Sequence, residues 1–291
     1  MSINHTFPRG PAAENARTDC HMHVYDARYP AAPGATLLPP DALLPDYLAV
    51  RSQLGLSRSV VVQPSAYGTD NRCTLDACDA LNAADAGSAR AVVSVDTDVS
   101  SGALRDLRRR GARGLRFGLA PGSANTPESI VPLARLAADH GMHVQLTLSA
   151  RRFVAMEALL AGLPCALVID HMGNIAPSEG TGHAAFATLR RLLDAGSTWL
   201  KLSGAYLLSE AGADQDAEPW QAAGALMRAF VVAAPQRMVW GSNWPHPTHV
   251  AHPPDDRALF SLLERVCGSA ETLDRILALN PQSLYGFESH E

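Results

Sequence analysis

The feature that most constrains the fold is an alternation, repeated eight times, of a short apolar or β-branched run with a longer stretch of helical spacing. The strand-like runs lie at residues 18–23, 58–63, 90–95, 113–118, 142–148, 165–171, 198–203 and 237–243. Several helical stretches, such as those before Gly111, Gly141 and Gly196, end at a glycine, the usual residue just beyond a helix. Eight such units in 291 residues predict an α/β fold, the (β/α)8 barrel of the TIM type.

An open doubly wound sheet shows the same alternation of strands and helices. No GxGxxG motif follows the first predicted strand, however, so we favour the barrel. No internal repeat or second-domain linker is visible. We therefore expect a single barrel domain over residues 17–291, preceded by an N-terminal leader over residues 1–16.

Composition argues against several classes of protein. The formal net charge of −5 gives no electrostatic reason to expect nucleic acid or an anionic membrane as a partner. No apolar run is long enough to span a membrane, and residues 1–16 lack the apolar core of a secretory signal, which predicts a cytoplasmic protein. The five cysteines are scattered and form no CxxC pair, which argues against a disulfide framework and against a cysteine-bound zinc site.

Three histidines are predicted to meet at the C-terminal ends of the strands, where barrel enzymes carry their active sites. His21 and His23 end the first strand as H-x-H, and since side chains alternate along a strand, both imidazoles point the same way. His171 ends the sixth strand. Three convergent imidazoles either hold zinc or donate hydrogen bonds to a substrate carbonyl.

The eighth strand ends at Asn243, within the segment Trp240–Pro247. Metal-dependent hydrolases on such barrels use this position for an aspartate that binds metal and takes a proton from water. An amide carries no charge and cannot accept a proton at neutral pH. We therefore favour use of the three histidines without a metal or other cofactor. His246 follows in the same segment and is expected either to contact substrate or to pack within the loop.

Arg116, near the end of the fourth strand, needs an anionic partner, because an unpaired buried charge is costly. Either a substrate carboxylate, bound bidentately, or a structural salt bridge with a buried aspartate such as Asp96 would supply it. Polar residues near the ends of other strands are expected to line the same pocket: Ser65, Thr69, Gln145, Lys201, Tyr206 and His246. Lys201 is the one lysine of the chain and lies inside an apolar segment.

Taken in order, these motifs resemble the amidohydrolase-related (amidohydrolase 2) family over about residues 7–287. The segments that carry the resemblance are Asp19–His23, Gln63–Ser65, Arg113–Phe117, Ile169–Gly173, Trp199–Gly204, Trp240–Pro247 and Asn280–Gly286. Within the family the chain is similar to the branch of 2-pyrone-4,6-dicarboxylate lactonase and D-galactarolactone isomerase. This resemblance implies an amidohydrolase-type barrel that hydrolyses or rearranges a lactone.

The resemblance also implies roles for individual residues. In the lactonase, histidines matching His21, His23 and His171 polarise the carbonyl without metal, and an arginine matching Arg116 binds a carboxylate. The isomerase carries asparagine at the position of Asn243 but lacks the first histidine of H-x-H. This chain combines both features. Two further lactonase arginines are not matched, since Asn174 and Leu207 lie at or near their positions, which disfavours a dicarboxylate substrate.

Together these observations predict a metal-independent enzyme that acts on a lactone of a small sugar-derived or aromatic-derived carboxylic acid. It does so by hydrolysis or by isomerisation, in which the substrate's own hydroxyl lessens the need for a base. One alternative is a mononuclear zinc hydrolase or decarboxylase that uses His21, His23 and His171. Another is a barrel that binds an acid or lactone without turnover, or a variant inactivated by an Asp-to-Asn change at position 243. Whether the chain forms a homo-oligomer is left open.

Overall fold

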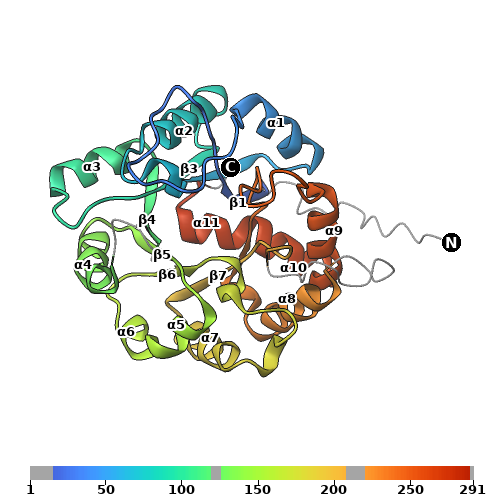
Figure 1. The fold of residues 1–291 in the computed structure, drawn as a ribbon. Coiled ribbons are helices and arrows are strands. Elements are labelled where there is room, and N and C mark those ends of the chain that lie inside the picture. The colour runs from blue at the N-terminus through green and yellow to red at the C-terminus, as the bar shows by residue number, and fades with distance from the viewer. Residues whose placement is uncertain (1–15, 119–125, 208–219, 289–291) are drawn as a thin grey trace.

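Eight parallel strands form one sheet, in chain order, in a computed structural model that describes residues 16–118, 126–207 and 220–288 (Figure 1). The strands are β1 (Thr18–Met22), β2 (Arg58–Val62), β3 (Ala89–Val93), β4 (Ala112–Gly118), β5 (His143–Thr147), β6 (Leu167–Ile169), β7 (Thr198–Leu202) and β8 (Met238–Trp240). The predicted (β/α)8 barrel is confirmed. The predicted leader lies, apart from Ala16, outside the described residues.

Helices surround the strands (Figure 1) and turn their apolar faces toward them. They are α1 (Leu44–Gln53), α2 (Arg72–Ala84), α3 (Ser101–Arg109), α4 (Ile130–Asp139), α5 (Ala150–Ala155), α6 (Glu157–Ala161), α7 (Ala184–Asp194), α8 (Gln221–Ala233), α9 (Asp256–Cys267), α10 (Ala270–Asp274) and α11 (Asn280–Tyr285). A π-helical turn, Arg275–Leu279, joins the last two. Among the described residues, no helix combines the length and the apolar character that crossing a membrane requires.

The sixth and eighth strands are shorter than the sequence predicts. β6 ends at Ile169 and β8 at Trp240, whereas the apolar runs continue to His171 and Asn243. Both of these residues have left-handed backbone, with φ of 51° and 63°, which no strand accommodates. Two predicted site residues therefore lie on sharp turns beyond the strands rather than at strand ends.

The C-terminal segment closes the N-terminal end of the barrel. Valines from β2, β3, β6 and β8 fill the interior and pack in one cluster with Tyr285 and Phe287. The guanidinium groups of Arg58 and Arg90, near the starts of β2 and β3, lie 5.1 and 4.7 Å from the centre of the Phe287 ring. Because this end is filled, the C-terminal ends of the strands remain for a functional site.

The seam between β8 and β1 is joined by hydrogen bonds around Asn243. The Asn243 N–H donates to the His21 carbonyl at 2.8 Å, and both the N–H and the hydroxyl of Ser242 donate to the Asp19 carboxylate. Gly241 allows this close approach, since a Cβ there would lie 2.4 Å from the His21 Cβ. The seam therefore brings Asn243 against the H-x-H strand.

Candidate active site

Asp170, the residue after β6, is the centre of a buried polar network at the C-terminal ends of the strands. Its Oδ2 accepts hydrogen bonds from the Thr147 hydroxyl at 2.7 Å and from Gln145 Nε2 at 3.1 Å, and its Oδ1 lies 3.6 Å from Lys201 Nζ. Asp170 is not among the residues that the sequence predicts for the site. The available signal was an aspartate at the end of an apolar run, which must find partners if it is buried.

The Lys201 ammonium is completely buried and completes this network. It donates to Gln145 Oε1 at 2.8 Å and to His21 Nδ1 at 3.2 Å. Burial lowers the pKa of Lys201, while the charge of Asp170 opposes that shift. Burial alone would raise the pKa of Asp170, but the Lys201 ammonium and the surrounding donors hold it well below its usual range. We call Asp170, Lys201, Gln145, Thr147 and His21 the strand network.

The two imidazoles of H-x-H point toward each other, with 3.2 Å between their Nε2 atoms. His23 Nδ1 lies 2.8 Å from the Val62 carbonyl, which only accepts, so His23 Nδ1 carries the proton and its Nε2 accepts from His21. Burial lowers the pKa of His23 to about 3 and holds that of His21 well below its usual range, so both rings are neutral at pH 7. In this arrangement the His21 Nε2–H is directed at His23, and both rings are buried.

His171 reaches the same cluster from a strained turn. Residues 171–174 all have left-handed backbone, with φ of 51°, 51°, 68° and 50°, although such residues normally occur singly. Gly173 packs so closely that a Cβ there would lie 2.5 Å from Leu189 Cδ1. The turn places the His171 ring 4.9 Å from the His21 ring and its Nδ1 2.9 Å from the Ser203 hydroxyl. Burial lowers the pKa of His171 to about 4.

Arg116 on β4 extends toward Asp170. Its Nη1 donates to the Gln63 carbonyl at 2.7 Å, and its Nε lies 3.9 Å from Asp170 Oδ2. That Nε is buried and has no hydrogen-bond partner among the described residues. The carboxylate beside Arg116 is therefore Asp170 and not the expected Asp96, which accepts a hydrogen bond from Thr69. The Arg116 side chain as a whole is 15% exposed, so part of it remains accessible.

Asn243 belongs to a second set of hydrogen bonds, which runs through the loops after β7 and β8. Its Nδ2 lies 2.8 Å from the Tyr206 hydroxyl, which in turn lies 2.8 Å from His246 Nδ1. His246 Nε2 lies 3.0 Å from Asp256 Oδ1 at the start of α9. The first three side chains are buried. We call Asn243, Tyr206, His246 and Asp256 the loop chain; its first three members are residues that the sequence predicts for the site.

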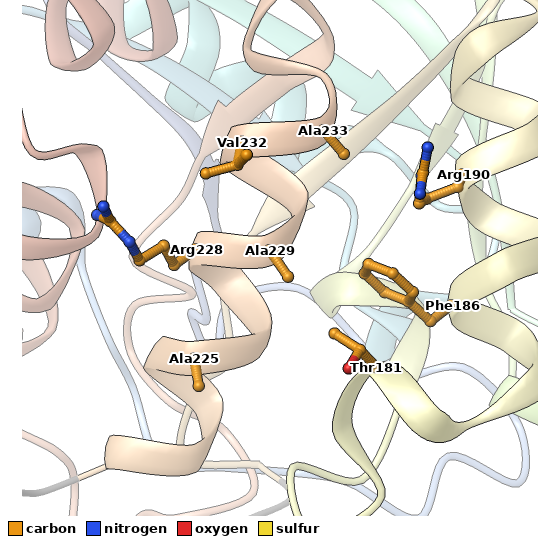
Figure 2. A pocket seen from close by; sticks show the side chains of 8 residues that line it. All are labelled: Thr181, Phe186, Arg190, Ala225, Arg228, Ala229, Val232 and Ala233. Atoms are coloured by element: carbon orange, nitrogen blue, oxygen red, sulfur yellow. The ribbon is translucent and has the colours of Figure 1, made fainter.

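Two predicted pocket residues lie apart from these networks. Ser65 is exposed and begins a short 3-10 turn. Thr69 donates to Asp96 at 3.2 Å and lines a separate pocket near α2 and α3. A further groove lies between α7 and α8 on the outside of the barrel (Figure 2), lined by Thr181, Phe186, Arg190, Ala225, Arg228, Ala229, Val232 and Ala233. None of these lining residues comes from a strand end.

Three side chains at the centre of the site could serve as metal ligands. One ligand atom each of His21, Asp170 and His171 lies within 4.8 Å of the others, and imidazole and carboxylate are ligands that catalytic zinc sites use. This set fits a divalent cation by donor type and includes Asp170 in place of the expected His23. The Lys201 ammonium, 3.6 Å from Asp170 Oδ1, already supplies a positive charge to the same carboxylate.

Fold and site define a barrel protein of the amidohydrolase type. The chain belongs to the amidohydrolase family, whose model, described as Amidohydrolase, matches residues 18–287. It is 32% identical over 281 residues to a 2-pyrone-4,6-dicarboxylate hydrolase of Comamonas testosteroni, covering 92% of this chain and 89% of that protein. It is 33% identical over 293 residues to a D-galactarolactone isomerase of Agrobacterium fabrum, covering 97% and 93%.

A crystal structure of an Agrobacterium tumefaciens protein in its apo form shows the same architecture. It superposes with a TM-score of 0.84 at 29% identity, covering 99% of this chain and 97% of that one. These matches cover nearly the whole chain, so the family assignment applies to the whole barrel.

Proposed function

We propose that this protein is an enzyme that acts on a lactone of a small carboxylic acid without a bound metal, and that a hydroxyl of the substrate, rather than water, is its preferred nucleophile. The named activities of the two relatives, a lactone hydrolysis and a lactone isomerisation, support the substrate class. The observation that carries the choice of nucleophile is Asn243, an amide where a water-activating carboxylate is expected, held beside intact neutral histidines.

The strand network would polarise the lactone carbonyl. The His21 Nε2–H is the donor that the carbonyl oxygen would accept, and Lys201 holds the opposite nitrogen of the ring at 3.2 Å. As the oxygen becomes an alkoxide, the ammonium stabilises the developing charge through the same imidazole. A preorganised donor of this kind typically lowers the activation barrier by about 3 kcal/mol. Arg116, whose side chain is 15% exposed, would anchor the substrate carboxylate.

The attacking hydroxyl would be oriented by Asn243 and deprotonated by a neutral imidazole. We assign this base to His171, whose pKa of about 4 leaves it unprotonated at pH 7 but makes it weak. A weak base suits an intramolecular nucleophile, because a well-placed hydroxyl has an effective concentration of roughly 10⁵ M or more. As the new ester C–O bond forms, the original ring C–O bond breaks, and protonated His171 returns its proton to the released oxygen. Water has no such advantage, so ring-size interconversion of the lactone is favoured over hydrolysis.

The test is to offer the protein a panel of sugar-acid 1,4- and 1,5-lactones and pyrone carboxylates, and to follow ring isomers by NMR and acid release by titration. We expect isomerisation without acid release from the natural chain, acid release from Asn243→Asp, and neither from His21→Ala. Acid release by the natural chain at the rate of the Asn243→Asp variant would refute the proposed nucleophile. Full activity in His21→Ala would refute the assignment of the active site to this cluster.

A zinc-dependent hydrolase or decarboxylase is the second candidate, because His21, Asp170 and His171 bring three ligand atoms within 4.8 Å. Zinc bound there would act as a Lewis acid toward the carbonyl. The two candidates differ in metal content. Gently purified protein that is active with far less than one equivalent of zinc, and stays active with a chelator, supports the first. One equivalent of zinc, with activity lost on chelation and restored by zinc, supports the second.

A further inference from the structure

Tyr25 continues the alternation of the H-x-H strand beyond its C-terminal end. It lies two residues after His23, and its backbone is paired with Ala42: the Tyr25 N–H donates to the Ala42 carbonyl at 3.1 Å, and the Ala42 N–H donates to the Tyr25 carbonyl at 2.8 Å. The Tyr25 ring lies 6.2 Å from the His23 ring and is inclined at 61° to it. A phenol is therefore held beside the imidazole pair by a fixed stretch of backbone.

The Tyr25 hydroxyl has no hydrogen-bond partner among the described residues, whereas the other tyrosines near this end of the barrel are bonded. The Tyr67 hydroxyl, for example, accepts from the Asp26 N–H at 2.8 Å and donates to the Asp26 carbonyl at 3.1 Å. Tyr25 is 4% exposed, and its oxygen is not one of the completely enclosed atoms without a partner, as the Tyr285 oxygen is. The O–H of Tyr25 can therefore donate to a ligand.

The Arg116 guanidinium lies close to this phenol. Arg116 Nη1 donates to the Gln63 carbonyl at 2.7 Å, and His23 Nδ1 lies 2.8 Å from the Val62 carbonyl, so the two side chains contact consecutive residues at the end of β2. Tyr25 is near enough for its ionisation to respond to the same guanidinium: burial raises the pKa of Tyr25, and the charge of Arg116 opposes that rise. A cationic donor and a neutral O–H donor therefore lie together beside the H-x-H pair.

We propose that Tyr25 is a substrate-binding residue whose hydroxyl donates a hydrogen bond to the same carboxylate that Arg116 anchors. This inference rests on the proposed function, because it names a second contact for the carboxylate of the lactone. An ionised carboxylate has about four lone-pair sites, so it can accept from a guanidinium and from a phenol at once. The phenol adds a donor without adding a second positive charge, which suits an acid with a single carboxylate at this position.

The test compares two neighbouring tyrosines. The Tyr25 and Tyr67 rings are 6.2 Å apart, and a change to phenylalanine removes only the hydroxyl from either. On a lactone that carries a carboxylate, Tyr25→Phe should raise KM about tenfold, with kcat within about twofold and an unchanged melting temperature. Tyr67→Phe should instead leave KM unchanged and lower the melting temperature by roughly 4 °C, because its hydroxyl holds the Asp26 backbone. Equal effects of the two variants on KM would overturn the inference.

Two further measurements determine whether Tyr25 and Arg116 bind the same carboxylate. A neutral lactone of the same ring size should show no rise in KM in Tyr25→Phe. In the double variant Tyr25→Phe with Arg116→Met, KM should rise by less than the product of the two single rises, since both changes act on one bound group. A rise with the neutral lactone, or a strictly multiplicative effect in the double variant, would contradict the shared contact.

A binding measurement separates this inference from the proposed function. If no lactone is turned over, the proposed function fails, and the binding of D-gluconate, a sugar acid with one carboxylate, is followed by ligand-observed NMR. Binding that is weakened in Tyr25→Phe but not in Tyr67→Phe would still support the role of Tyr25. Equal binding by the natural chain and both variants, or no binding by the natural chain, would refute it.

Discussion

The strand network and the loop chain lie at the same end of the barrel but differ in the groups they hold. The strand network buries an ammonium and a carboxylate, Lys201 and Asp170, with most of its members on β1, β5 and β7. The hydrogen bonds of the loop chain run from Asp256 through His246 and Tyr206 to Asn243, and these last three residues lie on loops. The buried charges of the site therefore lie on or next to strands, where the sheet fixes the backbone. The loops instead carry polar side chains that are linked to one another by hydrogen bonds.

Because the strand network buries charges, we expect substitutions there to destabilise the protein more than substitutions in the loop chain. The largest loss of stability is expected at Lys201. Lys201→Met would leave the completely buried Asp170 carboxylate without its ammonium partner, a loss of about 4 kcal/mol in the free energy of unfolding. Chemical denaturation of the variant measures this. The double variant Lys201→Met with Asp170→Asn removes both charges and should recover most of the loss. A single variant as stable as the natural chain would mean that the pair is not a buried ion pair.

The next largest effect concerns substrate binding at the edge of the strand network. Arg116→Met removes the guanidinium whose Nε lacks a partner among the described residues. Because a charge-assisted hydrogen bond contributes about 2 kcal/mol, KM for a lactone carrying a carboxylate should rise about 30-fold. A neutral lactone of the same ring size is the matched control and should change little. An equal rise for both substrates would show that Arg116 acts on the fold of the site and not on the anion.

Neutral imidazoles in the strand region also predict acid sensitivity. The folded pKa of His171, about 4, lies below its ordinary value of 6.5, so the unfolded chain binds a proton first as pH falls. The stabilisation is complete above about pH 6.5 and is lost progressively as pH falls toward 4. At pH 5 the loss attributable to His171 is about 2 kcal/mol. In His171→Gln, the slope of the unfolding free energy against pH should fall by the equivalent of about one bound proton as pH falls from 7 to 5.

That measurement is specific because the other buried histidines serve as internal controls. His23 and His143 also have pKa values lowered to about 3 by burial, so the variant should keep their share of the acid sensitivity. An unchanged slope in His171→Gln would mean that this imidazole is not buried in its neutral form.

The sequence predicts the fold better than the site for a physical reason. Apolar periodicity and glycine stops depend on near neighbours, and they located all eight strands and the H-x-H pair. The hub at Asp170 depends on donors from β5 and β7, up to 31 residues away in the case of Lys201, so no local pattern marks it. The left-handed turn at residues 171–174 is equally hidden, because only one of its members is glycine. Tyr206 and His246 were found singly; their connection through Asp256 needed three dimensions.

The smallest effects should fall on polar residues near the mouth that belong to neither network. Ser65 is exposed, and Thr69 hydrogen-bonds Asp96, so Ser65→Ala and Thr69→Val should change kcat/KM less than about twofold and unfolding free energy by less than about 0.5 kcal/mol. The informative comparison is with Tyr206→Phe, which also removes a single hydroxyl but breaks the loop chain at its centre. If Ser65→Ala lowers kcat as much as Tyr206→Phe does, then any polar group near the mouth of the barrel affects catalysis to a similar extent. The hydrogen bonds that link the loop chain would then have no particular role in catalysis.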